Sequence, residues 1–401
     1  MAWRNIWRNR RRTLITMASI IMAVLLSSVM SSMQEGQYDQ MIENTVGSFS
    51  GHIQIQAPYY FDEPSIDHSL EMTSELQKTL ENDPAIEAII PRIDSYALAG
   101  GLQKTKAGMV VGIDVEAEKL LSKPHEKVIE GNYFTSNNEH GVLVAQGLAD
   151  FLNVGVGDSL VLISAGYHGM NAADLIPITG ILQFGITDMN NSLIYLPLET
   201  AQHFYAADGR LTSIALLTNN PAKVSQIAAH IKTELPEELE VLDWKELVPE
   251  LVQAIQADRG SGRIILMVLY MVVGFGILGT ILMMTAERKF EFGVLIAIGT
   301  PKIRIAGMLI LEMIMLTFFG TIAGMILSLP VMYFYHFNPM EFTGQAAAAI
   351  EEYGMEPFIR FSVDPEILLL QGAVIAIITL LISLYPLFHT RNINPVEAMR
   401  A

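Results

Sequence analysis

Long apolar runs alternate with polar segments along the chain. Four runs are nearly uncharged and long enough to cross a bilayer, which takes about 18 or more apolar residues. They are residues 13–33, residues 264–285, a stretch within residues 303–335, and residues 367–388. The first run exceeds the roughly 7–15-residue apolar core of a secretory signal, and no small-residue cleavage site follows it. It is therefore predicted to be a retained membrane anchor.

The long segment between the first two runs, residues 34–262, has a mixed pattern. Helical spacing predicts a helix over residues 69–84 and another over residues 221–235, and a third over residues 247–263 leads into the second run. Short β-rich runs bounded by Gly, Asn and Asp predict strands at 52–56, 108–114, 141–148, 158–163, 177–182 and 191–198. The predicted fold class is a membrane α-helical protein with four transmembrane helices and a large α+β extracytoplasmic domain between helices 1 and 2.

The distribution of charge predicts the orientation of the chain. Residues 1–12, the 286–305 loop and the tail 389–401 together hold eleven Lys and Arg against three acidic residues, whereas residues 34–262 hold 32 acids and 12 bases. The loop 338–366 is also acidic. Because Lys and Arg mark the cytoplasmic side, both termini and the 286–302 segment are predicted inside, with the large domain and the loop outside.

The first twelve residues also have an amphipathic pattern. Trp3, Ile6 and Trp7 share one helical face, and arginines surround them. Such a helix can lie in the headgroup layer of a membrane. The alternative is a simple charge cluster that directs insertion, and the interfacial helix is favoured.

The composition narrows the class of function. The chain of 401 residues is 51% hydrophobic and 17% charged, carries a net charge of −17 and has no cysteine. The acidic balance argues against nucleic acid as a partner. The motifs G-x-x-x-x-G-K-[ST], H-E-x-x-H and G-x-S-x-G do not occur, and G-x-G-x-x-G occurs only inside the second apolar run, at residues 274–279, without the strand before it that a nucleotide site needs. The nine histidines show no metal-ligand spacing. No catalytic residue, metal site or bound cofactor is therefore predicted, and the chain is not expected to be an enzyme by itself.

Polar and small residues within the apolar runs are further candidates. Glu312 is either a proton site or a structural partner of a basic residue in the inner loop, and the second interpretation is favoured. Gly320 and Gly324 form a G-x-x-x-G motif, which predicts close helix packing.

The polar interruption between the second and third runs predicts a short helix. Phe290, Val294, Ala297 and Ile298 share one face, while Gly299 and the proline two residues later stop the helix. Because a simple turn between two helices needs only about 2–8 residues, we expect this helix to dock onto another protein.

The same stretch, "AERKFEFGVLIAIGTPKIRI", resembles the cytoplasmic coupling segment of FtsX-like ABC-transporter permeases. That family shows an E-R-x-x-E-x-G-x-x-x-A-x-G pattern. The matching positions are Glu287, Arg288, Glu291, Gly293, Ala297 and Gly299. Residues 141–162 and 178–202 are similar to the periplasmic core of the MacB efflux and LolC/LolE lipoprotein-release permeases. The resemblance covers essentially the whole chain in order.

This resemblance implies a bacterial inner-membrane permease subunit that works with a separate ABC ATPase dimer and a second permease copy or paralogue. The ATPase, not this chain, would use ATP and Mg. The expected function is extraction of a lipoprotein or other lipid-linked substrate, with a periplasmic carrier, an adaptor or a lipoprotein and membrane lipid as further partners. The alternatives are MacB-like efflux with an adaptor and FtsX-like activation of a cell-wall hydrolase. The residues implied in ATPase coupling are Glu287, Arg288, Phe290, Glu291, Gly293, Val294, Ala297 and Gly299.

Overall fold

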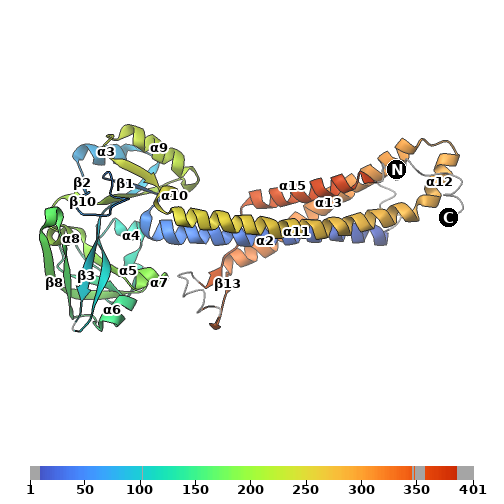
Figure 1. Cartoon of the computed structure of the whole chain (residues 1–401). Coiled ribbons are helices and arrows are strands. Elements are labelled where there is room, and N and C mark those ends of the chain that lie inside the picture. The colour runs from blue at the N-terminus through green and yellow to red at the C-terminus, as the bar shows by residue number, and fades with distance from the viewer. Residues whose placement is uncertain (1–9, 102, 346, 348–356, 386–401) are drawn as a thin grey trace. The chain divides into compact units, whose positions relative to one another are not determined.

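The computed structural model describes residues 10–385 except residues 102, 346 and 348–356. The described residues belong to two compact units (Figure 1). A helical unit falls within Met1–Asp39, Ala254–Glu341 and Phe358–Ala401, and an α+β unit within Gln40–Gln253 and Phe342–Pro357. Most of the predicted interfacial helix (1–12) and the whole tail 389–401 lie outside the described residues.

The described part of the helical unit consists mainly of four long helices and one short helix. The long ones are α2 (Arg10–Ile42), α11 (Pro249–Glu287), α13 (Lys302–Phe337) and α15 (Pro365–Ile382), and the short one is α12 (Lys289–Ala297). A two-residue pair, β13 (Met340–Glu341) and β14 (Phe358–Ile359), joins the chain on either side of the α13–α15 connection. Among the described residues, four helices are long and apolar enough to cross a membrane: Thr13–Gly47, Pro249–Glu287, Lys302–Phe337 and Pro365–Ile382.

These helices pack through one apolar cluster and expose the rest of their apolar surface. The cluster joins all four long helices through buried side chains, which are Ile20, Ala23, Val24, Ile277, Ile281, Met313, Leu316 and Ile375. On the outside, Val272, Phe275 and Phe318 are each more than 60% exposed. Helices that are apolar on every side suit a lipid environment, because acyl chains can cover these side chains.

Two of the helices extend well past their predicted ends. The apolar runs end at residue 33 and begin at residue 264, yet α2 continues to Ile42 and α11 begins at Pro249. At about 1.5 Å per residue, the 39 residues of α11 span nearly twice the roughly 30 Å hydrocarbon core of a bilayer. The α+β unit is consequently shorter at both ends than the predicted 34–262 domain.

The α+β unit is built on a ten-stranded mixed sheet of order β12-β1-β11-β3-β4-β9-β6-β8-β5, with β7 pairing with β3 and β8. Only the β4–β9 and β6–β8 pairs are parallel. The strands of this unit are β1 (Ile53–Gln56), β2 (Leu70–Glu71), β3 (Ile86–Gly100), β4 (Thr105–Ile113), β5 (Val128–Gly131), β6 (Val142–Ala145), β7 (Ser159–Ala165), β8 (Asn171–Leu182), β9 (Leu193–Pro197), β10 (Arg210–Leu211), β11 (Ser213–Thr218) and β12 (Glu240–Asp243).

Short helices cover this sheet and bury two main clusters of apolar side chains. Around β1 and β11, α3 and α9 contribute Leu80 and Ile231 to one cluster; around β6 to β9, α6 and α8 contribute Leu148 and Phe204 to the other. The helical elements are η1 (Glu43–Ser50), α3 (Ser74–Asn82), α4 (Glu118–Leu121), α5 (Pro124–Lys127), α6 (Gln146–Leu152), η2 (Tyr167–Gly169), α7 (Thr187–Asn190), α8 (Leu198–Phe204), η3 (Pro221–Lys223), α9 (Val224–Glu234) and α10 (Trp244–Leu247).

The predicted elements of this unit are largely present. Five of the six predicted strands overlap β1, β4, β7, β8 and β9 and extend past their ends by at most two residues, and the sixth, 141–148, is divided between β6 and α6. The helices predicted at 69–84 and 221–235 correspond to α3 and α9, although Leu70 and Glu71 of the first range form β2. Val224 and Ile231 of α9 are buried. The longest strand, β3, was not predicted, because it carries Arg92 and Asp94 in the middle of its apolar pattern.

Candidate functional site

The polar interruption at residues 286–305 forms a separate helix between two long ones. A local break at Arg288, with φ −93° and ψ 4°, separates α12 from α11. At the other end Gly299 takes a φ of +95°, which a residue with a side chain rarely adopts. The N–H of Thr300 donates to the carbonyl oxygen of Leu295 at 2.9 Å, as in a Schellman-type helix end. The helix α12 is thus bounded by two defined breaks.

One face of α12 is fixed against the start of α13. Phe292 is 1% exposed and packs in a cluster with Ile305 and Leu309 of α13, and Leu295 and Ile296 complete the contact. Burying a phenylalanine side chain stabilises a contact by about 1.5–3 kcal/mol. This cluster therefore ties α12 to α13.

A buried ion pair provides a second attachment. The guanidinium of Arg288 donates to both carboxylate oxygens of Glu312, from Nη1 at 2.8 Å and from Nη2 at 3.2 Å. The two side chains are 5% and 1% exposed. The parallel, two-bond geometry of an Arg–carboxylate pair fixes orientation as well as distance. Glu312 therefore has the inner-loop basic partner that the favoured interpretation of the sequence requires.

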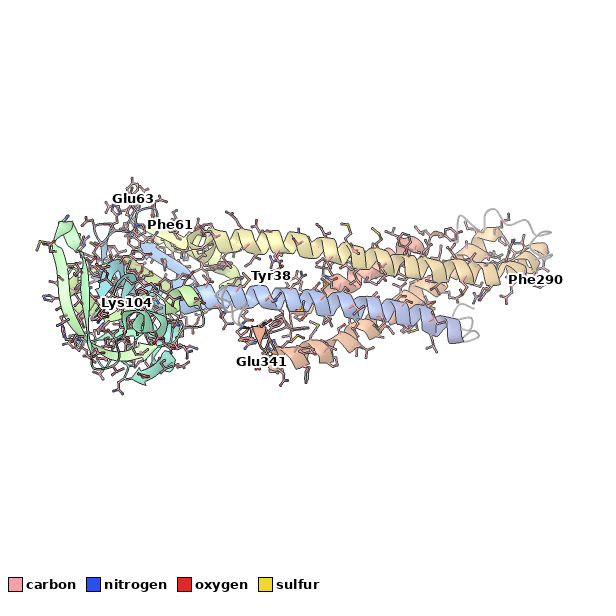
Figure 2. The ribbon with its side chains drawn as sticks, turned by 60° about the horizontal axis from the view of Figure 1, so that its bottom comes forward. Tyr38, Phe61, Glu63, Lys104, Phe290 and Glu341 are labelled. Carbon is pink, nitrogen blue, oxygen red and sulfur yellow. The ribbon has the colours of Figure 1, made fainter. Side chains whose placement is uncertain are left out.

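The opposite face of α12 is exposed. Phe290 is 55% exposed, Val294 37% and Ile298 73%, and the stick view labels Phe290 at the end of α11 (Figure 2). The remaining exposed candidates from the sequence are Glu287, Glu291, Ala297 and Gly299. These exposed apolar and acidic side chains are called here the α12 face.

Two of the predicted coupling residues lie on the buried side instead. Arg288 is 4% exposed and Gly293 is also buried. Neither residue is therefore part of the exposed α12 face.

The glycines of α13 mark a close helix contact. A Cβ added to Gly320 would lie 2.9 Å from Cγ2 of Ile20, and one added to Gly324 would lie 2.7 Å from Cβ of Val24. Both neighbours belong to α2. The G-x-x-x-G motif therefore lets α13 and α2 approach closely, as small residues do between membrane helices.

A polar cleft that the sequence analysis did not predict lies where α2, α11 and α15 meet. Its volume is about 510 Å³. Tyr38 donates to Asp258 at 2.7 Å, and Arg259 pairs with Glu35 at 2.6 Å. The lining residues are Ser31, Gln34, Glu35, Tyr38, Asp39, Arg259, Arg263, Leu266, Ser362, Asp364, Glu366, Ile367, Leu370 and Gln371. The sequence contains one signal for this cleft: just outside the apolar runs 13–33 and 264–285, polar residues such as Glu35, Tyr38 and Arg259 recur at helical spacing.

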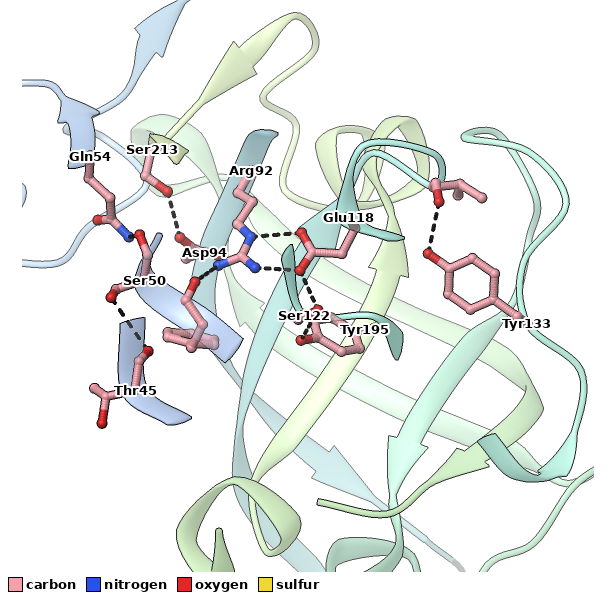
Figure 3. A network of polar contacts seen from close by, with 12 residues as sticks. Thr45, Ser50, Gln54, Arg92, Asp94, Glu118, Ser122, Tyr133, Tyr195 and Ser213 are labelled. Carbon is pink, nitrogen blue, oxygen red and sulfur yellow. Dashed lines mark hydrogen bonds and ion pairs between the residues drawn. The ribbon is translucent and has the colours of Figure 1, made fainter. Parts of the chain in front are cut away.

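The α+β unit contains a buried polar network around Arg92 (Figure 3). Arg92 is fully buried, donates from Nε to Glu118 at 2.9 Å and also donates to the carbonyl oxygen of Phe49 in η1. Ser213 donates to Asp94 at 2.8 Å. The network links η1, which continues directly from α2 along the chain, to the longest strand of the sheet.

The charges in this network influence each other's protonation. Burial by itself would lower the pKa of Arg92. The charge and the hydrogen bonds of the nearby Glu118 carboxylate have the larger combined effect and raise the pKa of Arg92 above its ordinary value. Burial raises the pKa of Asp94, although Arg92 and the Ser213 hydroxyl oppose the shift. Arg92 therefore stays charged and paired, and its contacts serve structure.

Comparison with known proteins places this architecture in a family. Residues 263–395 match the model of the FtsX-like permease C-terminal region, and residues 13–234 match that of the MacB-like periplasmic core domain. Among solved structures, the periplasmic region of MacB from Actinobacillus actinomycetemcomitans has a TM-score of 0.36 at 13% identity, covering 54% of this chain and 98% of that one.

Similar proteins include components of lipoprotein-releasing systems. The chain is 25% identical over 255 residues to the lipoprotein-releasing system transmembrane protein LolE of Haemophilus influenzae, covering 62% of this chain and 60% of that protein. It is 21% identical over 412 residues to the LolC protein of Xylella fastidiosa strain Temecula1, covering 98% and 95%.

A third relative is an exporter. The pyoverdine export ATP-binding/permease protein PvdT of Pseudomonas syringae pv. tomato is 26% identical over 345 residues, covering 82% of this chain and 50% of that protein. The matches thus span less than two thirds of LolE and half of PvdT. Since one family model covers more than half of the chain and a second covers most of the rest, the resemblance is confirmed, and the chain belongs to the FtsX-like ABC-transporter permeases with a MacB-like periplasmic core domain.

Proposed function

We propose that this chain is the permease subunit that passes ATP-driven motion from a separate cytoplasmic ATPase to the α+β unit. The observation that carries the proposal is the construction of α12. The Arg288–Glu312 pair and Phe292 hold the helix to α13, while Phe290 and Val294 stay exposed. A helix that is rigidly attached on one face and apolar on the other can transmit the movement of a docked partner to α11 and α13.

The family supports the wider arrangement. Its members are membrane-spanning permeases with a periplasmic-type domain, which implies the inner membrane. We propose that four helices span it, with the α+β unit between the first two on the outer side and both termini inside. The 401 residues contain no G-x-x-x-x-G-K-[ST] motif, so we assign ATP and Mg to the partner subunit. A second permease, identical or paralogous, completes the proposed complex.

For the substrate we propose a lipoprotein or another lipid-linked molecule, taken from the outer leaflet of the inner membrane. The LolE and LolC relatives are named for lipoprotein release. The polar cleft between α2, α11 and α15 gives a headgroup a place beside the lipid-facing helices. Efflux with an adaptor is the second candidate, because the PvdT relative is named for pyoverdine export. Activation of a cell-wall hydrolase is the third.

The experiment is purification of the tagged full chain from its native membranes in mild detergent, with mass spectrometry of the proteins that accompany it. We expect an ABC ATPase with the wild type, and at least a tenfold loss of it with Phe290→Asp or Val294→Asp, because a carboxylate on the α12 face disfavours apolar docking. Phe61→Asp in the α+β unit, where Phe61 is 41% exposed (Figure 2), is the matched control and should retain the ATPase.

The same experiment separates the substrate candidates. Acylated lipoproteins and a second permease with the wild type support lipid-linked substrate release, a periplasmic adaptor supports efflux, and a cell-wall hydrolase supports the activator role. An unchanged amount of ATPase with both α12 variants would refute docking at this helix, provided that the variants reach the membrane at wild-type levels.

A further inference from the structure

Three side chains with metal-binding atoms meet in the α+β unit, away from the site described above. They are Asp83, which follows the last residue of α3, and His230 and Glu234, which are one turn apart on α9. One ligand atom from each residue lies within 4.8 Å of the other two. The sequence predicts no metal site here, because Asp83 is distant in the chain from α9 and His230 has no second histidine beside it.

The spacing of the two α9 residues suits a metal better than a direct bond. The distance from Nε2 of His230 to Oε1 of Glu234 is 3.6 Å, which is too long for a hydrogen bond. Two ligands that each bind zinc at about 2.0–2.2 Å in tetrahedral geometry lie about 3.4 Å apart. The observed separation is close to that value, so a metal ion fits between these atoms with little movement.

Asp83 supplies an independent observation. Its Oδ1 atom accepts a hydrogen bond from the N–H of Ala85 at 2.8 Å, which fixes the direction of the carboxylate. Its Oδ2 atom is buried and has no hydrogen-bond partner among the described residues. A buried acceptor without a partner is costly. A bound cation would satisfy it.

The three ligands are also held on well-packed elements. Leu80 of α3 and Ile231 of α9 belong to the same apolar cluster and are 1% and 2% exposed, so the two helices have a fixed spacing. The amide of Asn219 donates to the carbonyl oxygen of Pro84 at 2.9 Å and holds the chain just after Asp83. Preorganised ligands on rigid elements favour metal binding.

We propose that Asp83, His230 and Glu234 form a binding site for a divalent transition metal, with zinc as the ion that fits one imidazole and two carboxylates. The three residues line a cavity of about 490 Å³ together with Thr79 and Asn82, which leaves room for water at the fourth position. The metal ties the end of α3 to α9. This site is independent of ATPase docking and of the transported substrate.

The competing explanation is an ordinary surface contact between His230 and Glu234, whose side chains are 58% and 43% exposed. The chain contains a matched control for it. His140 and Asp174 are also exposed, with Nε2 of the histidine 3.3 Å from Oδ2 of the aspartate. No third His, Asp or Glu in the described part of the chain joins that pair within metal-ligand distance.

The test is a zinc titration of the metal-stripped full chain in detergent, purified without a polyhistidine tag, with a chromophoric chelator as competitor. We expect one zinc ion per wild-type chain and at least tenfold weaker binding after His230→Gln or Glu234→Gln. Both residues are exposed, so these substitutions should leave the fold intact. His140→Gln should bind zinc like the wild type. Asp83→Asn, which keeps the acceptor for Ala85, should also weaken binding.

A second readout is the thermal melting temperature of the same samples. Zinc should raise it for the wild type and for His140→Gln, and should not raise it for His230→Gln, because a ligand stabilises only the state that binds it. Wild-type-like zinc affinity of His230→Gln, or a wild type that binds no zinc at equimolar concentration, would overturn the proposal.

Discussion

Arg288 and Glu312 illustrate how a tertiary contact changes the role of a residue. Both belong to segments that the sequence marked as candidates, one for docking and one for a polar function within an apolar run. Their two hydrogen bonds of 2.8 and 3.2 Å, at almost no exposure, assign both to holding α12 against α13. Removing one charge of a buried pair is more damaging than removing both, because the other charge stays in a low-dielectric environment.

Arg288→Met should destabilise the chain by about 3–5 kcal/mol, because the Glu312 carboxylate loses its guanidinium. The double variant Arg288→Met/Glu312→Leu should recover most of that loss. The measurement is thermal melting of the purified proteins in detergent. A single variant that melts like the wild type would show that the pair contributes little.

The sequence predicts the surroundings of some of these residues and not of others. The exposed positions of Phe290 and Val294 follow from helical periodicity, which needs only neighbouring residues. The burial of Arg92 could not be predicted, since its partners Glu118 and Phe49 lie in other elements. The position of Asp83 beside His230 and Glu234 of α9 could not be predicted either, for the same reason.

Among the elements, α2 and α13 depend on small residues at their contact. Gly324 lies so close to α2 that an added Cβ would be 2.7 Å from Cβ of Val24 and 3.1 Å from the carbonyl oxygen of Ile21. Because both a side chain and the backbone of α2 are in the way, the two helices must separate if the glycine is replaced.

We expect Gly324→Leu to destabilise the helical unit by about 1–3 kcal/mol, which is the usual cost of overpacking. Gly276→Leu on α11 is the matched control, since an added Cβ at Gly276 meets no atom within 4 Å. Both variants are compared by melting temperature in the same detergent. Equal melting temperatures would mean that α2 and α13 are not tightly packed at this position.

The helices α2 and α11 are longer than their apolar runs. The ends of apolar runs predict where a helix leaves the hydrocarbon core, and they do not predict where it stops being a helix. Residues 34–42 and 249–263 continue as helix, and Tyr38–Asp258 and Arg259–Glu35 join the two extensions. These cross-helix pairs depend on tertiary placement, so hydropathy could not reveal them.

For the whole molecule, the proposed orientation rests on the unequal distribution of Lys and Arg along the chain. The basic 286–305 loop is assigned to the cytoplasm and the acidic α+β unit to the outside. The absence of cysteine from the sequence makes this simple to test, because a single introduced cysteine has no competitor.

Two exposed positions can report the orientation: Asp208 in the α+β unit and Ala297 on α12. In spheroplasts, a membrane-impermeant maleimide should label Asp208→Cys at least tenfold faster than Ala297→Cys. After detergent solubilisation both should react. Fast labelling of Ala297→Cys in intact spheroplasts would reverse the proposed orientation.

The sequence by itself determined the properties that depend on local pattern. Apolar runs identified the long helices, periodicity identified α12 and its outer face, most strands of the α+β unit followed from alternation and turn residues, and the motif around Glu287 identified the family. Each of these depends on residues that lie in one continuous segment of the sequence.

The tertiary structure alone decided which distant groups meet. It turned Arg288 inward to Glu312, placed α2 against the glycines of α13, and satisfied Arg92 with partners from η1 and α4. It also brought Asp83 to His230 and Glu234. A buried charge is tolerated only where partners converge on it, and such convergence depends on how elements pack, which no local pattern encodes.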